Sequence, residues 1–282
     1  MKKISTLLFL VTASLTVLAQ TPTNKIVLTN GQQIKFVSTI KGNIGMDMMG
    51  QTMETLMDIS NSRSITVKDI LNNEYKLDAV TTHTKLSMSA MGQDRSFDSD
   101  NKDDMKGEMK DAGKKINVVK KIILTTGGKC KDDEKISPEK TEEDNNPMTA
   151  MMQQMFGEGL EAATTESYFM LIPEGKKVGD SWSDSVIAGT TKTFWNYTWD
   201  SNSENTALIK ATGKLTTNNT VNTQGMDIAM NIATDITETR KIDFKTGIIL
   251  NKITTGKLTG TAEVMGQSLP MTGTTTTTVT AQ

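Results

Sequence analysis

The feature that most constrains the fold of this chain is a run in which large apolar residues recur at nearly every second position. Every second residue from Met226 to Ile236 is apolar or threonine, and aspartate, asparagine or alanine occupies the positions between. A β-strand has a side-chain period of two, so the run predicts a long strand with one buried and one polar face. Leu86, Met88 and Ala90 alternate with serines in the same way.

Turn residues separate the alternating runs. These turn signals are Asn30-Gly31, Asn72-Asn73, Thr126-Gly127-Gly128, Asn218-Asn219 and Lys245-Thr246-Gly247. Threonine is abundant, and its β-branched side chain fits a pleated surface. The sequence therefore predicts a mostly β fold, as a large curved antiparallel sheet or half-barrel of meanders with one short amphipathic helix.

The tripeptide Met-Gly-Gln occurs three times, at residues 49–51, 91–93 and 265–267. An apolar residue precedes each copy, and an apolar residue returns two positions after the glutamine in two of the three. This spacing is typical of a tight reversal between paired strands, with a glycine bulge or a binding element as alternatives. We expect the three copies to be hairpin tips.

One segment breaks the period of two. Asn146-Pro147 is a good helix start, and Met148, Met151, Met152, Met155 and Phe156 follow at helical spacing. The charged stretch before it has few apolar residues to bury, which is typical of an exposed loop. The predicted organisation is a signal peptide at 1–19, an N-terminal β-meander at 20–128, a charged loop at 129–146, and the short helix with a C-terminal β-meander at 147–282. A second short helix is expected at 101–112, and the two meanders could join edge to edge.

The N-terminus has the pattern of an export signal. Lys2 and Lys3 precede a mostly apolar run, and Val17-Leu18-Ala19 favours cleavage after Ala19. We expect an exported protein, periplasmic or extracellular. No later segment has 18 consecutive apolar residues, and the 5% aromatic content is low for the aromatic girdles of membrane-spanning strands. The mature chain is therefore not expected to be an integral membrane protein.

Charge and residue counts narrow the range of chemistries. A formal net charge of −2 gives no basic face for nucleic acid. His83 is the only histidine, whereas hydrolytic triads need a histidine and zinc sites usually more than one. Cys130 is the only cysteine, which leaves no intramolecular disulfide, and we expect an exposed thiol in the charged loop. We predict no catalytic residues, no cofactor and no metal, with His83 as an ordinary strand residue.

Two acidic or sulfur-rich features invite a metal interpretation. Asp98 and Asp100 match the first two ligand positions of a calcium loop, but Lys102 then occupies a ligand position. We therefore expect a turn, in which these residues cap a helix or close an Asx turn. Thioethers can bind Cu(I), and the chain has 19 methionines. Most of them fall on the apolar phase of a strand or of the helix, so we expect them to pack a core.

The sequence FWNYTW at 194–199 is the sharpest local feature. Trp195, Tyr197 and Trp199 share one face of the expected strand. This face could stack on a sugar, line an apolar ligand cavity or form a core layer beneath the helix. The ligand-lining candidates are Trp195, Tyr197 and Trp199, with Met151 and Met155 from the helix.

Three stretches carry a family resemblance: LIPEGKKVGDSWSDS (171–185), the segment 72–100 and IDFKTGIILNKITTGKL (242–258). They resemble an uncharacterised family of secreted bacterial β-proteins, a domain of unknown function. The resemblance implies an exported, mostly β protein and supplies no catalytic residues. More loosely, the expected architecture is similar to the periplasmic lipoprotein-carrier half-barrels, although fold alone does not define function.

These features predict an exported non-enzymatic β-protein that binds an apolar or amphipathic, lipid-like ligand in a curved sheet. The alternative is a structural or interaction module of the cell envelope that pairs with a protein partner. Its expected pairing edge is the threonine-rich terminal strand at 272–281. An enzyme with two catalytic carboxylates needs no histidine, but nothing selects one pair among 33 acidic residues.

Overall fold

The protein is an almost wholly antiparallel β structure. The computed structural model describes residues 22–48, 50–90, 92–107, 113–114, 116–131, 165–188, 190–223, 226–264 and 266–282. The strands of the N-terminal half are β1 (Gln33–Met48), β2 (Gln51–Leu71), β3 (Glu74–Ala90), β4 (Gln93–Asp98), β5 (Val119–Thr125) and β6 (Cys130–Lys131). Those of the C-terminal half are β7 (Ser181–Ala188), β8 (Thr191–Ser203), β9 (Thr206–Thr223), β10 (Met226–Asp243), β11 (Ile249–Val264) and β12 (Gln267–Ala281). Two short 3₁₀ helices are η1 (Asp104–Lys106) and η2 (Thr165–Tyr168).

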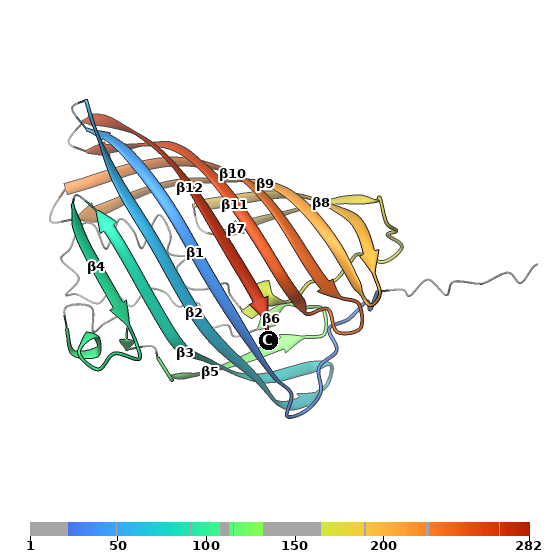
Figure 1. Cartoon of the computed structure of the whole chain (residues 1–282). Coiled ribbons are helices and arrows are strands. Elements are labelled where there is room, and N and C mark those ends of the chain that lie inside the picture. Colours follow the sequence, from blue (N-terminus) through green and yellow to red (C-terminus); the bar gives the residue numbers. More distant parts are fainter. Residues whose placement is uncertain are drawn as a thin grey trace, which may run out of the picture.

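The strands form one curved, unclosed sheet (Figure 1). Its order is β6-β5-β3-β2-β1-β12-β11-β10-β9-β8-β7, and β4 pairs with the second half of β3. The first and last strands of the chain, β1 and β12, lie side by side and join the two halves. The predicted curved antiparallel sheet is thus confirmed. The prediction that residues 272–281 form an edge is wrong, because β12 is paired on both sides, with β1 and β11.

The alternation predicted for residues 226–236 is present in β10. Ile228, Met230 and Ile232 are buried on the concave face, while Asn231 and Asp235 are exposed on the other. A period of two places all residues of one phase on one face, so the register of neighbouring strands continues this pattern across the sheet. We call the concave side the inner face.

Five of the seven two-residue connections between consecutive strands lie at one end of the sheet, which we call the tip end. Three of them contain the Met-Gly-Gln repeat, whose glutamines begin β2, β4 and β12. Gly50, Gly92 and Gly266 have φ of 81°, 73° and 79°, a left-handed conformation that glycine adopts without strain. The repeats are therefore hairpin tips, as expected.

The opposite end, the base end, is closed by other turns. Asn72 and Asn73 connect β2 to β3 with φ of 49° and 65°, as expected for a primed turn. Residues 126–128 and 245–247 also form turns where predicted. The predicted turn at Asn218-Asn219 is wrong, because both residues lie inside β9 and continue its pairing with β10.

Two irregular segments fill the base end of the inner face. Ile26, from the segment before β1, is fully buried, and its carbonyl accepts a hydrogen bond of 2.7 Å from the Tyr75 hydroxyl. The Tyr168 ring of η2 stacks on Phe36 of β1 at 4.1 Å. Lys129, just before β6, forms an ion pair with Glu166 of η2, which joins this edge of the sheet to the η2 segment. The apolar side chains around Ile26 and Tyr168, which include Phe36 and Tyr75, form one buried core cluster.

Several local predictions meet a different outcome. The predicted helix near 147–157 lies outside the described residues, whereas the one expected at 101–112 is reduced to the 3₁₀ turn Asp104–Lys106 among its described positions. Cys130 was expected exposed in a loop, but it begins β6, is half-buried and packs against the core. Among the described residues, no helix is both long and apolar enough to cross a membrane.

Candidate functional site

A belt of polar and charged side chains crosses the middle of the inner face. The polar belt consists of Asn61, Ser38, Lys252, Arg240, Glu238 and Thr254. The strand register places its members in two adjacent rows, because Lys252 pairs with Arg240, and Thr254 pairs with Glu238. Ser38 and Lys252 lie in the same row on either side of Val279. The belt is therefore a direct consequence of register.

Apolar patches flank the polar belt on both sides. Toward the tip end lies the tip-side patch, formed by Ile40, Ile44, Met57, Ile59, Ile228, Met230, Ile232, Leu258, Ala262 and Met271. Toward the base end lie Phe36 and Ile65, and beyond β10 lie Ile209 and Trp199. Charged groups placed between apolar surfaces lose hydration and need partners in the protein or in a ligand.

Lys252 is the most unusual member of the polar belt. It is only 8% exposed, and its ammonium donates one long hydrogen bond of 3.5 Å to the Ser167 carbonyl of η2. The pKa of Lys252 is lowered to about 8, mainly by burial and also by the nearby Arg240 charge, against the opposing effect of Glu238. A buried lysine with so weak a partner is a common mark of a functional position.

Glu238 and Arg240, which lie two residues apart on the inner face of β10, form an ion pair. The Arg240 guanidinium binds the Glu238 carboxylate, whose second oxygen accepts a hydrogen bond of 2.6 Å from the Thr254 hydroxyl. The Arg240 side chain is 15% exposed and that of Glu238 is 4% exposed, so the pair is shielded from water. Within the polar belt, two cations therefore meet one carboxylate.

The predicted aromatic strip lies beside this ion pair. Tyr197 and Trp199 are buried, and Trp195 is half-buried on the same face. The Tyr197 ring stacks between Trp195 and Trp182 of β7, with centroid distances of 5.9 and 5.6 Å. Arg240 reaches across β9, so its guanidinium carbon lies 5.3 Å from the Tyr197 centroid and 5.9 Å from that of Trp195. Such contacts favour a cation over the ring faces.

A small residue on β9 makes this contact possible. Gly213 faces Trp195 directly in the register, and a Cβ atom built there would lie 2.7 Å from the indole Cε3. The indole therefore lies flat over the glycine backbone. Without a side chain at Gly213, the aromatic strip and the β10 ion pair share one continuous surface.

The segment around η2 covers the polar belt with weak polar contacts. Beyond the Ser167 carbonyl on Lys252, the Met170 sulfur lies 3.3 Å from an Arg240 nitrogen. The hydroxyls of Ser38, Thr165 and Ser167 are buried and have no hydrogen-bond partner within the described structure. Buried hydroxyls without partners cost free energy, so these groups remain available to form hydrogen bonds with a ligand.

The predicted lining residues are only partly brought together. Trp195, Tyr197 and Trp199 share the inner face as expected, whereas Met151 and Met155 lie outside the described residues. A hollow of about 460 Å³ lies at the tip end, lined by Thr52, Met53, Glu54 and Gly92, not beside the aromatic strip.

Glu238, Arg240 and Lys252 were missed by the sequence reasoning. The alternating phase of β10 continues beyond Ile236 to Glu238 and Arg240, so two charges on an inward phase were a readable signal. Lys252 has no comparable signal, because its burial depends on η2, which lies 85 residues away in the chain.

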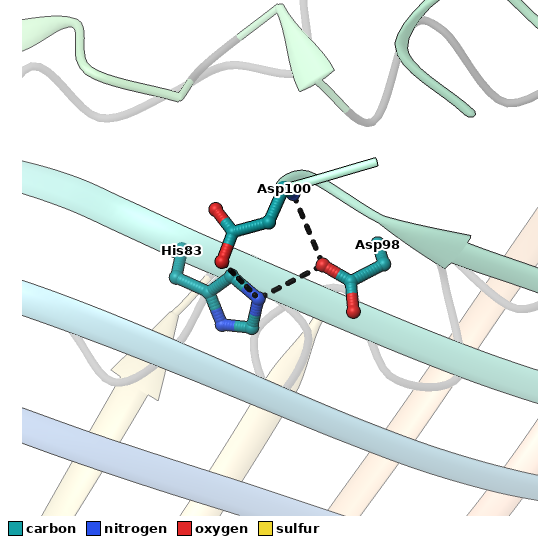
Figure 2. Close-up of side chains that lie close together, drawn as sticks. All are labelled: His83, Asp98 and Asp100. Atoms are coloured by element: carbon teal, nitrogen blue, oxygen red, sulfur yellow. Dashed lines mark hydrogen bonds and ion pairs between the residues drawn. The ribbon is translucent and has the colours of Figure 1, made fainter. Parts of the chain in front are cut away.

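A second cluster, on the outer face, could hold a metal ion. His83, Asp98 and Asp100 converge there, with all three potential ligand atoms within 4.8 Å of one another (Figure 2). The prediction that Asp98 forms an Asx turn is confirmed, because its carboxylate accepts a hydrogen bond of 3.0 Å from the Asp100 N–H.

A family model described as a family of unknown function (DUF6263) matches residues 72–249. The chain belongs to this family. The match confirms the resemblance to an uncharacterised family drawn from the sequence. No curated protein matches the chain.

Two solved structures show distant similarity. The COG4313 outer membrane channel from Pseudomonas putida F1 is 9% identical, with a TM-score of 0.28, covering 93% of this chain and 99% of that one. The Salmonella typhi OmpF complex with daunomycin is 7% identical, with a TM-score of 0.25, covering 90% and 99%.

Proposed function

We propose that this protein is an exported, non-enzymatic carrier or receptor that binds an amphipathic ligand with an anionic headgroup on the inner face of its curved sheet. The observation that carries the proposal is the excess positive charge of the polar belt. Lys252 and Arg240 are both largely buried, and Glu238 is the one carboxylate that the belt offers them. An anionic headgroup would complete the charge balance at a position where water is excluded.

The contacts now made to these cations are easily exchanged. Lys252 has a long contact to a neutral carbonyl, and Arg240 has a thioether as its contact beyond Glu238 and the rings. A carboxylate or phosphate oxygen forms a stronger hydrogen bond with a cation than either group. The hydroxyls of Ser38 and Ser167, which have no hydrogen-bond partner among the described residues, could donate to the same headgroup.

The apolar tail has a matching surface. The tip-side patch begins in the same row as Glu238 and Thr254, with Ile40 and Ile59, and extends toward the hairpin tips. Its members include Met57, Met230 and Met271, with Met46 and Met88 at the border. Methionine side chains adapt to irregular apolar partners, which favours a flexible alkyl chain. The headgroup at the belt and the tail on this patch define one orientation.

Native mass spectrometry of the protein purified from its own envelope tests the proposal directly. We expect a bound amphiphile that organic extraction releases and identifies. In vitro, cis-parinaric acid should bind with enhanced fluorescence, whereas its methyl ester, which has the same tail without the charge, should bind at least about tenfold more weakly if one charge-assisted contact is lost.

A matched pair of variants locates the headgroup. Lys252→Met should weaken binding of the acid and leave binding of the ester unchanged. Lys257→Met removes the same charge from the exposed outer face of β11 and should change neither. Equal binding of acid and ester, or equal effects of the two variants, would contradict the proposal.

The alternative of an envelope interaction module now depends on a different edge. β7 pairs only with β8 among the described strands, and its Val186 and Ile187 are 50% and 72% exposed. Ile187 of β7 and Phe194 of β8 lie on the outer face, whereas Val186 lies on the inner face. An unpaired edge with exposed apolar residues can accept a partner strand. If Ile187→Lys abolishes the recovery of a specific envelope partner while ligand binding persists, this second function is supported.

A further inference from the structure

The outer-face cluster has the geometry of a small metal site. His83 Nε2 lies 3.0 Å from Asp98 Oδ1 and 3.6 Å from Asp100 Oδ2, and the two carboxylates approach the same ring nitrogen (Figure 2). In a tetrahedral site, two ligand atoms that each lie about 2.0–2.2 Å from a Zn²⁺ ion are separated from one another by distances similar to these two. Little movement is therefore needed to place one ion between the three atoms.

A β-bulge brings His83 to this position. Arg63 of β2 pairs with Thr81, but the preceding Ser62 pairs with His83, so Thr82 is an extra residue in β3. Without the bulge, residue 83 would share the inner face with Thr81. The extra residue turns it outward, onto the face of Lys85 and Asp98.

The two aspartates are held in place by the end of β4. Asp98 is the last residue of β4 and pairs with Lys85, and its backbone N–H donates to the Asp104 carboxylate at 2.8 Å. The Asp98 carboxylate also accepts a hydrogen bond of 3.0 Å from the Asp100 N–H, so the end of β4 fixes the position of this group.

Solvent reaches the cluster, and the neighbouring lysine does not cover its ligand oxygen. Asp98 and His83 are 30% and 27% exposed, whereas the Asp100 side chain is 82% exposed and forms the outer wall. Lys85 lies 3.6 Å from Asp98 Oδ2, the oxygen on the other side of the carboxylate, so Oδ1 remains turned toward the imidazole. An ion can enter from solvent past Asp100.

We propose that His83, Asp98 and Asp100 bind a divalent transition-metal ion of the Zn²⁺ type, with water completing the coordination. Imidazole with carboxylate oxygen suits zinc and its neighbours, whereas Mg²⁺ and Ca²⁺ prefer oxygen ligands alone. The ion would link β3 to the loop after β4. This site lies on the face opposite to the polar belt and does not depend on the proposed ligand.

The single histidine makes a direct test possible. In the tag-free mature protein, the imidazole resonances in a ¹H–¹⁵N spectrum come from His83 alone. Addition of one equivalent of ZnCl₂ should shift them to a new saturated position, and the melting temperature should rise. Millimolar CaCl₂ or MgCl₂ should produce neither change. Unmoved resonances at excess ZnCl₂, or the same response to CaCl₂, overturn the proposal.

Variants assign the ligands. Loss of a group that merely orients a metal ligand weakens binding about 10–100-fold, so Asp98→Asn and Asp100→Asn should each weaken Zn²⁺ by at least about tenfold in a chelator competition. Asp94→Asn, an exposed carboxylate of the same strand, and Cys130→Ser should retain the affinity. Unchanged affinity in both ligand variants, or its loss in Cys130→Ser, would contradict the assignment. Far-UV circular dichroism checks that each variant is folded.

Discussion

Replacement of Lys252 by methionine should stabilise the protein at neutral pH. Methionine has a similar length and no charge, and the position is 92% removed from solvent, since 8% of Lys252 is exposed. Burial, the largest cause, lowers the pKa of Lys252 from 10.5 to about 8. A tenfold change in proton affinity corresponds to about 1.4 kcal/mol, so the charged form costs the native state roughly 3 kcal/mol.

The sign of the pH dependence follows from the two pKa values. Below pH 8, Lys252 is protonated in both states, and the native state bears the whole cost. Between about pH 8 and 10.5, the native lysine loses its proton while the unfolded one keeps it, so the stability of the wild type rises with pH. The advantage of Lys252→Met should therefore be about 3 kcal/mol at pH 7 and should fall steadily toward pH 10.

Urea unfolding at a series of pH values measures this difference. The midpoint of Lys252→Met should lie above that of the wild type at pH 7 with an unchanged slope. Subtraction of the two curves removes the titration of Tyr168 and Tyr197, whose pKa values are raised by burial in both proteins. Arg240 and Glu238, the charges nearest Lys252, are also present in both.

Lys257→Met is the matched control on the same strand. Its lysine is exposed, so its stability should remain within about 0.5 kcal/mol of the wild type at every pH. If Lys252→Met is less stable than the wild type at pH 7, or if the difference does not change with pH, Lys252 is not a destabilising buried cation and the reasoning fails.

Three further variants test the surroundings of the site and one turn. Glu238→Ala leaves the buried Arg240 without its carboxylate and should destabilise by about 3–5 kcal/mol in urea unfolding. Gly213→Val places side-chain atoms where the Trp195 indole lies, so tryptophan emission should shift and stability should fall by about 1–3 kcal/mol. Asn73→Ala, at φ of 65°, should cost about 1 kcal/mol in thermal unfolding, because alanine tolerates the left-handed region poorly.

Each of these variants has a neighbouring control. Glu263→Ala, on the outer face of β11, should have little effect on stability, and an equal loss would show that burial does not decide the result for Glu238. Gly213→Ala should produce a smaller version of the valine effect, and unchanged emission in both would contradict the close approach of Trp195. Asn73→Gly should preserve the turn, so equal losses for glycine and alanine would exclude backbone strain as the cause.

Local pattern was sufficient for much of the fold. The alternation in β10 and the Met-Gly-Gln repeats each depend on residues within one strand or one hairpin, and both were read correctly. The position of β12 in the sheet was predicted wrongly. The pairing of β1 with β12 joins the two ends of the chain, and no local signal encodes it. The threonine-rich strand has the composition of an edge but lies between two long strands.

The sites depended on the same kind of distant contact. His83 was read as an ordinary strand residue, and a single-residue bulge is invisible to a pattern with a period of two. Asp98 and His83 lie 15 residues apart, and only the hairpin register brings them to 3.0 Å. The aromatic strip, by contrast, was found because its three members alternate within one strand.

The polar belt has a structural explanation that competes with ligand binding. Buried polar groups can fix strand register, because a shift by one residue would move Glu238 and Arg240 to the outer face and expose the apolar residues of β10. Lys252 separates the two explanations, because it contributes a cost to stability and makes one long contact to η2. A residue that serves register should lose stability when it is replaced, whereas one that serves a ligand should gain stability and lose affinity. Opposite changes in these two quantities for Lys252→Met would assign the lysine to the ligand, and parallel losses would assign it to the sheet.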